Sequence, residues 1–195
     1  MSRAAARRSD RRKPLLYATL AVVVLAVIVA VGLASRNAVP KAASDAGSSA
    51  KLKVGQTAPE FAVQSNAGPF DLAQVSTPVL LEIFATWCPH CQHETVVLNG
   101  LAASYAGKLA IVAVSGSPYG IDGSSPESLA DVNTFGAQFS VRYPLAYDPT
   151  LTVAQHYIQG GFPTLVLIDA HKKVRWFRDG EVAQTDLVHA INGVL

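Results

Sequence analysis

The stretch PVLLEIFATWCPHC, residues 78–91, decides how the chain folds. Its first eight residues, 78–85, form an apolar run rich in branched side chains and interrupted by one glutamate. Such a run, opened by proline, predicts a strand buried on both faces of a sheet. From Pro89 to about Tyr105 the apolar residues follow a helical pattern, and proline is well tolerated in the first helical turn. The stretch therefore predicts a buried strand leading into a helix, with the chain's two cysteines at the junction.

Strand and helix signals alternate through the rest of the chain. We expect a hairpin that turns at 66–69 and a short helix in PTLTVAQHY, with Thr185 capping the last helix. The other expected elements are strands at 109–115, 164–169 and 173–178, a short strand in YPLAYD, and helices at 125–139 and 185–192. Strands that alternate with helices and end in a hairpin predict an α/β fold with a central mixed sheet and helices on both faces.

The chain before this body divides into three segments. Residues 1–14 form a basic tip, in which residues 1–13 hold six basic residues and one acidic residue. Residues 15–34 are uncharged and long enough for a transmembrane helix, and residues 35–52 are small and polar, as in a flexible tether. The remaining part, 53–195, is the expected folded domain.

Charge placement predicts how the chain meets a membrane. The basic tip precedes the apolar segment, so the positive-inside rule favours a cytoplasmic N-terminus and an extracytoplasmic body. Residues 54–195 hold twelve acidic and six basic residues, so the overall charge of +2 is no argument for nucleic-acid binding. We expect a single-pass signal-anchor in the cell membrane; a cleaved signal peptide is the alternative, and both place the body where disulfides can form.

The two cysteines, Cys88 and Cys91, allow several kinds of site. Haem attachment requires histidine directly after the second cysteine, and Gln92 stands there. Structural zinc requires four ligands, whereas His93 and the distant His156 are the only histidines that could join the pair. A structural disulfide across two residues would close too small a loop to stabilise the chain much. No metal or other cofactor is expected.

A redox pair fits the spacing best. At the start of a helix, Cys88 faces free N–H groups and the positive end of the helix dipole, which favours a nucleophilic thiolate. Cys91, about one turn further on, can attack a mixed disulfide and release the substrate. His90 could add positive charge or a hydrogen bond to the Cys88 thiolate, or it could be an exposed loop histidine.

The motif FATWCPHC after a hydrophobic strand resembles the active site of the thioredoxin-like superfamily. The opening segment VGQTAPEF, the added material at about 110–145 and the later GGFPTLVLID resemble its membrane-anchored TlpA/ResA-like branch of thiol-disulfide oxidoreductases. The resemblance covers about residues 54–195. It implies a thioredoxin-like fold and a redox disulfide between Cys88 and Cys91.

The resemblance also implies roles for residues outside the cysteine pair. Pro163 would form a cis peptide bond facing the cysteines, and the backbone of Phe162 would pair with a substrate strand beside Trp87. Glu82, six residues before Cys88, would accept the Cys91 proton directly or through water; otherwise its side chain would reach solvent from a strand edge. Glu94, six residues after Cys88, would tune the pair, or it would be an ordinary solvated helix residue.

The expected function is an extracytoplasmic thiol-disulfide oxidoreductase, most similar to the TlpA/ResA-like reductants. Its partners would be protein thiols and disulfides, apocytochrome or other exported proteins among them, and a membrane protein that recycles the cysteine pair. The Pro-His pair between the cysteines resembles DsbA-type oxidants, which leaves an oxidant as the alternative. Copper carriers space their cysteines more widely. Peroxiredoxins need threonine and proline where Ala85 and Leu81 stand, so a metallochaperone and a peroxidase remain minor alternatives.

Overall fold

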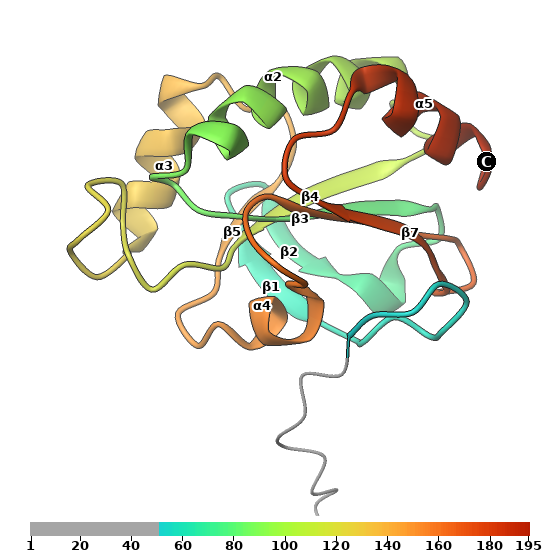
Figure 1. The fold of residues 1–195 in the computed structure, drawn as a ribbon, viewed down its shortest axis with the longest axis horizontal. Helices are drawn as coiled ribbons and strands as arrows, with labels where there is room; N and C mark the ends of the chain where they lie inside the picture. The colour runs from blue at the N-terminus through green and yellow to red at the C-terminus, as the bar shows by residue number, and fades with distance from the viewer. Residues whose placement is uncertain (1–50) are drawn as a thin grey trace, which may run out of the picture. The chain divides into compact units, whose positions relative to one another are not determined.

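Strand β3 (Val79–Phe84) lies inside a mixed sheet, as its unbroken apolar run predicts, and all six of its residues are buried. The computed structural model describes residues 51–195 (Figure 1). The sheet has seven strands in the order β2-β1-β5-β4-β3-β6-β7. Strand β3 pairs in parallel with β4 (Ala110–Ser115) and antiparallel with β6 (Thr164–Ile168).

Two hairpins form the ends of the sheet. The first joins β1 and β2 around the turn expected at 66–69, and the second joins β6 and β7. Strand β5 connects the first hairpin to β4. The bounds of these strands are Ala62–Ser65 for β1, Gly68–Asp71 for β2, Leu145–Tyr147 for β5 and Val174–Asp179 for β7. The mixed sheet expected from the sequence is confirmed.

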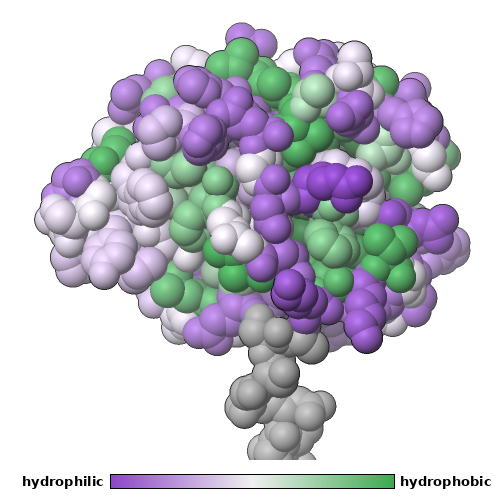
Figure 2. Space-filling view, viewed as in Figure 1, coloured by the Kyte–Doolittle hydropathy of each residue, from purple (hydrophilic) through white to green (hydrophobic). Residues whose placement is uncertain are grey.

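Helices cover both faces of the sheet, as Figure 1 shows. One apolar cluster packs α2 (Pro89–Ser104), α3 (Leu129–Gln138) and α5 (Gln184–Asn192) against one face. A second cluster packs α4 (Thr152–Tyr157) and the 3₁₀ turn Leu72–Gln74 against the other. On the face shown in Figure 2, hydrophilic and hydrophobic side chains are interspersed, because the helices turn their apolar sides inward.

One expected helix start and one expected helix cap are wrong. Helix α3 begins at Leu129 rather than near 125, because Ser128 and Asp131 form a capping box there. The backbone before it is held in a loop, with the N–H of Glu127 donating to the carbonyl of Pro118. Helix α5 is preceded by Ala183, which offers no side-chain cap, so the capping role expected of Thr185 is also wrong.

One residue expected in the tether packs with the folded domain. Leu52, placed at the end of the tether, is 3% exposed and packs in the second apolar cluster. Its N–H donates to Gln159 Oε1 at 2.9 Å. The basic tip and the predicted membrane segment at 15–34 lie outside the described residues. Within residues 51–195, no helix has both the length and the apolar character required to cross a membrane.

Gly116, directly after β4, allows the chain to pack closely behind the cysteine motif. A Cβ atom at this position would lie 2.4 Å from Ile83 Cγ2 and 3.3 Å from a ring carbon of Phe162. Its N–H donates to the carbonyl of Phe84 at 2.9 Å, which continues the pairing of β3 with β4. The missing side chain therefore makes room for the Phe162 ring beside the end of β3.

Candidate active site

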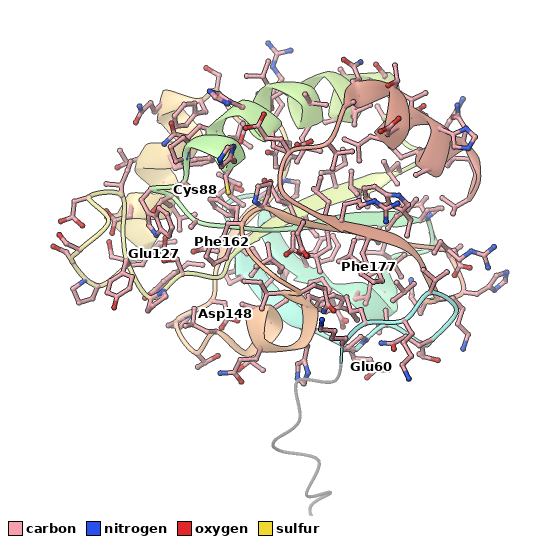
Figure 3. All side chains as sticks on the ribbon, in the orientation of Figure 1. Glu60, Cys88, Glu127, Asp148, Phe162 and Phe177 are labelled. Carbon is pink, nitrogen blue, oxygen red and sulfur yellow. The ribbon has the colours of Figure 1, made fainter. Side chains whose placement is uncertain are left out.

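Cys88 stands at the junction that the sequence predicts. It is the N-cap residue of α2, and Pro89 occupies the first helical turn. Its Sγ lies 3.7 Å from the carbonyl oxygen of Phe162, and both residues are labelled in Figure 3. Both cysteines are thiols in this structure. The N-cap position places Cys88 beside the free N–H groups and the positive end of the α2 dipole.

The segment opposite Cys88 has the form that the resemblance implies. The Phe162–Pro163 peptide bond is cis, which confirms that expectation. The Trp87 ring packs edge-on against Phe162, with ring centroids 6.1 Å apart, and its Nε1–H donates to Ser117 Oγ at 2.8 Å. Trp87 remains 37% exposed. An aromatic surface and a backbone carbonyl therefore lie beside the Cys88 sulfur.

Cys91 lies behind Cys88 and is fully buried. Burial, followed by the negative charge of Glu82, raises the pKa of the Cys91 thiol far above its usual range. A thiol in this environment gives up its proton only when a nearby group accepts it. Cys91 is therefore placed to react with Cys88 from inside the protein, and it needs a base.

Glu82 is the carboxyl group suited to act as that base, since its charge acts on the Cys91 thiol. It shares a face of β3 with Leu80 and Phe84, since side chains alternate along a strand, and it is 1% exposed. The alternative that its side chain reaches solvent from a strand edge is wrong. Burial, and secondly the charge of Glu94, raises the pKa of Glu82 well above its usual range.

Glu94 is also buried, at 1% exposed, so the alternative of a solvated helix residue is wrong. Its Oε2 accepts a hydrogen bond from the Val182 N–H at 2.8 Å. Burial raises the pKa of Glu94 to about 7, against the lowering effect of that hydrogen bond. Among residues 51–195, Glu82 Oε1 and Glu94 Oε1 are the buried side-chain atoms that lack a hydrogen-bond partner.

Tyr143 and Thr95 complete the polar interior behind Cys91. The Tyr143 hydroxyl lies 3.4 Å from Glu82 Oε2 and 3.5 Å from Thr95 Oγ1, and the Thr95 hydroxyl donates to the Cys91 carbonyl at 2.9 Å. Tyr143 falls in the short segment YPLAYD, which offered no sign of a role in the site. Its contact with Glu82 depends on how that segment packs under α2, which only the tertiary structure shows.

His90 does not contact Cys88 through a hydrogen bond. Its Nδ1–H donates to Glu181 Oε1 at 2.5 Å, and the ring of His93 contacts the same oxygen at 3.2 Å. The side chain of His90 is 67% exposed. Across the described part of the chain, no group of three or more histidine, cysteine or acidic side chains has a geometry suited to a metal ion.

Glu127 is a buried carboxyl group that the sequence did not reveal. It accepts hydrogen bonds from Thr86 Oγ1, at 2.9 Å, and from the Ser115 hydroxyl. Burial raises the pKa of Glu127, while the two hydroxyl groups lower it. The sequence predicted only that this residue lies near the start of a helix. Its hydrogen bonds to Thr86 and Ser115 connect the loop before Trp87 to the end of β4.

Known proteins are similar over most of the described domain. A model of the AhpC/TSA family matches residues 54–177, and the chain belongs to this family. The thiol-disulfide oxidoreductase ResA of Bacillus cereus is 29% identical over 127 residues, which cover 64% of this chain and 68% of that protein. The thioredoxin-like protein YneN of Bacillus subtilis is 26% identical over 138 residues, 70% of this chain and 77% of YneN.

The solved structures agree with these relatives. A thiol:disulfide interchange protein DsbE structure from Chlorobium tepidum superposes with a TM-score of 0.65 at 27% identity, covering 74% of this chain and 99% of the other. The expected fold and enzyme class are confirmed: the chain is a thiol-disulfide oxidoreductase with a thioredoxin-like fold. Leu81 and Ala85, where a peroxiredoxin would need proline and threonine, are buried apolar residues.

The first prediction concerns the proton of Cys91. Glu82→Gln removes the carboxylate but keeps the shape, so release of a mixed disulfide should slow by roughly 10²-fold. Rapid-quench analysis of a substrate disulfide on Cys88 measures that release. Tyr143→Phe is the matched control, because it removes a hydroxyl contact and leaves the carboxylate in place. Release at the parent rate in Glu82→Gln would show that another group takes the proton.

The second prediction concerns stability and pH. The folded pKa of Glu94, about 7, exceeds the 4.5 of an unperturbed glutamate, so the folded protein binds more protons than the unfolded chain between these values. The contribution of Glu94 to the free energy of unfolding is therefore full below about pH 4.5, and it is lost as the pH rises through 7. The raised pKa of Glu82 acts in the same direction.

Urea unfolding of the reduced protein from pH 5 to 8 measures this dependence. Glu94→Gln should flatten the decline and raise the free energy of unfolding at pH 8, relative to the parent, by about 1–2 kcal/mol after allowing for solvent screening. Glu60→Gln, at an exposed position, is the control and should follow the parent. An unchanged slope in Glu94→Gln would contradict the raised pKa.

Proposed function

We propose that the chain is an extracytoplasmic reductant of protein disulfides, of the ResA and DsbE kind. The observation that carries the proposal is the placement of the two thiols on α2. Cys88, which is 4% exposed, lies at the start of the helix beside the Phe162 carbonyl, while Cys91 has no exposed surface and lies near the charge of Glu82. Such a pair suits an attack on an external disulfide followed by an internal release.

The reaction proceeds in two exchanges. The Cys88 thiolate attacks one sulfur of a substrate disulfide, the substrate S–S bond breaks, and one substrate thiolate leaves and takes up a proton. Cys91 then transfers its proton to Glu82 and attacks the Cys88 sulfur. The bond between Cys88 and the substrate breaks, the second substrate thiolate leaves, and a Cys88–Cys91 disulfide forms. Two electrons have passed from the enzyme to the substrate.

The surroundings of Cys88 support a protein substrate. The carbonyl of Phe162 faces the sulfur, and an extended substrate backbone can pair with this segment while Trp87 offers an exposed ring. Exported proteins with reducible disulfides are the proposed substrates, with apocytochrome as one candidate. A membrane dithiol protein would reduce the resulting Cys88–Cys91 disulfide and restore the enzyme.

The relatives favour a protein of the ResA and DsbE kind over a DsbA-type oxidant. The similar proteins carry the names ResA and DsbE, and the resemblance to DsbA is confined to the Pro-His pair. The potentials of thioredoxin-like proteins span about 150 mV, so the residues around the cysteines decide the direction. The oxidant alternative rests on His90, and the ring of this residue is hydrogen-bonded to Glu181 rather than to Cys88.

The activity test uses the two cysteine variants. Cys91→Ser should accumulate mixed disulfides with protein substrates through Cys88, because the releasing thiol is absent, and Cys88→Ser should accumulate none. Both variants should lose the catalysed reduction of insulin. Mass spectrometry of alkylated, unreduced samples identifies the trapped species. Equal trapping by both variants would reverse or remove the assigned roles, and insulin reduction by Cys88→Ser would refute the proposed site.

The proposed location rests on the apolar segment 15–34 and the basic residues before it. A reporter that is active only outside the cytoplasm should work when fused after Ser49, and the protein should stay with membranes after a carbonate wash. A shortened, soluble chain that starts near Ser35 would show cleavage instead of anchoring. A silent fusion would contradict the extracytoplasmic location.

A further inference from the structure

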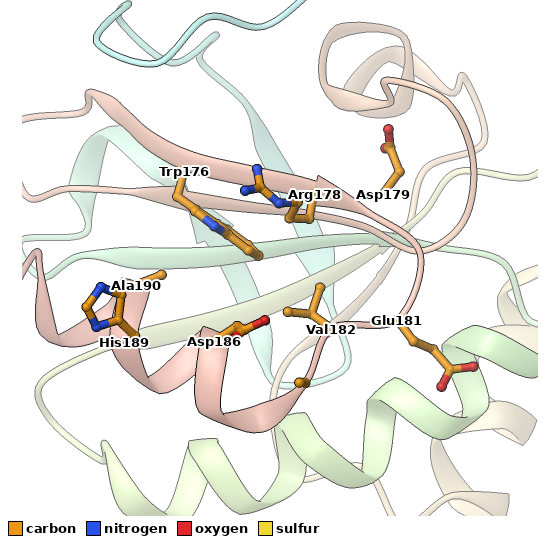
Figure 4. Close-up of a pocket in the computed structure, with 9 residues that line it drawn as sticks. Trp176, Arg178, Asp179, Glu181, Val182, Asp186, His189 and Ala190 are labelled. Atoms are coloured by element: carbon orange, nitrogen blue, oxygen red, sulfur yellow. The ribbon is translucent and has the colours of Figure 1, made fainter.

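Three consecutive residues between β7 and α5 hold the two halves of the site together. The Gly180 N–H donates to the Pro163 carbonyl at 2.7 Å, and the Val182 N–H donates to Glu94 Oε2 at 2.8 Å. Between them, the Glu181 side chain reaches α2, as Figure 4 shows. This segment, 180–182, therefore contacts both the proline opposite Cys88 and the helix that begins at Cys88.

Glu181 contacts α2 through two histidines. His90 Nδ1 lies 2.5 Å and His93 Nδ1 lies 3.2 Å from the same carboxylate oxygen. A carboxylate oxygen accepts, so both ring nitrogens are donors in these contacts. Hydrogen bonds from His90 and then His93 hold the pKa of Glu181 below its usual range. Glu181 is therefore a carboxylate at neutral pH.

The position of His90 gives this contact a consequence for the cysteine pair. A cation within a few ångströms of a thiolate stabilises it, and a stabilised thiolate makes the corresponding disulfide a stronger oxidant. His90 lies between the cysteines in sequence and could supply such a charge. Its ring instead donates to a carboxylate, whose negative charge offsets an imidazolium. Any stabilising effect on Cys88 is reduced accordingly.

We infer that Glu181 is a positioning residue, whose carboxylate holds the His90 ring away from Cys88 and offsets the charge of that ring. As a result, the Cys88–Cys91 pair is more reducing than it would be if the His90 ring were free. This inference deepens the proposed function and rests on it. It explains how a chain that has the Pro-His pair of DsbA-type oxidants between its cysteines can act as a reductant. The electrons still pass between the substrate and Cys88–Cys91, and Glu181 takes no part in the transfer.

The test measures the equilibrium of the cysteine pair with glutathione. Glu181→Gln should shift the equilibrium toward the reduced enzyme by about two- to fivefold. A tenfold change in this equilibrium constant corresponds to about 30 mV, so the reduction potential of the cysteine pair should become about 10–20 mV less negative. The three side chains involved are exposed, at 67%, 71% and 41% for His90, His93 and Glu181, so the variant should fold.

A double-mutant cycle separates the routes by which Glu181 could act. If Glu181 acts through His90, its substitution should have no effect in a His90→Ala background and its full effect in a His93→Ala background. Persistence of the shift in His90→Ala would mean a direct effect on Cys88, and its loss in His93→Ala would assign the effect to His93. Either result would overturn the inference.

Asp186→Asn is the matched control, because it removes one negative charge from the first turn of α5 and leaves the partner of His90 in place. It should leave the equilibrium with glutathione unchanged, and an equal shift would show a general charge effect instead. Insulin reduction by the parent protein tests the proposed function separately. An active parent with an unshifted Glu181→Gln equilibrium would refute only the role of Glu181.

Discussion

Exclusion of water from the space between β3 and the start of α2 is the constraint on which the site depends. Three ionisable groups lie there without solvent, namely Glu82, Cys91 and Tyr143, and burial is the largest cause of the raised pKa of each. A buried charge is unfavourable, so these groups hold their protons until one of them must react. The apolar strand and the helices packed over it create this condition.

The sequence predicted the elements whose signals are local and strong. The apolar run of β3, the proline that opens α2 and the two-residue spacing of the cysteines each indicate their structure within a few residues. Glu82 was recognisable as a candidate site residue because a buried carboxyl group in an apolar strand is unfavourable unless it has a function. The cis bond before Pro163 was different, because it followed from the family resemblance and not from the residues alone.

What the sequence missed depends on contacts between distant segments. Glu127 and Glu181 lie 41 and 91 residues from the partners Thr86 and His90, and no periodic pattern links such positions. For Glu127 and Glu181, a partner across the fold decided the role of the residue. The late start of α3 has a local cause, since the capping box of Ser128 and Asp131 begins the helix there and the pairing of Tyr119 with Pro126 keeps the preceding loop extended.

The complete burial of Cys91 also governs timing. Cys91 lies inside the fold on the same helix turn as Cys88, so the bond between Cys88 and a captured protein can be opened from within, without a thiol from solution. An internal attack of this kind behaves as a reaction at very high effective concentration, independent of how much thiol is present outside. The enzyme thus carries its own means of releasing a captured partner, and this route stays open in a thiol-poor environment.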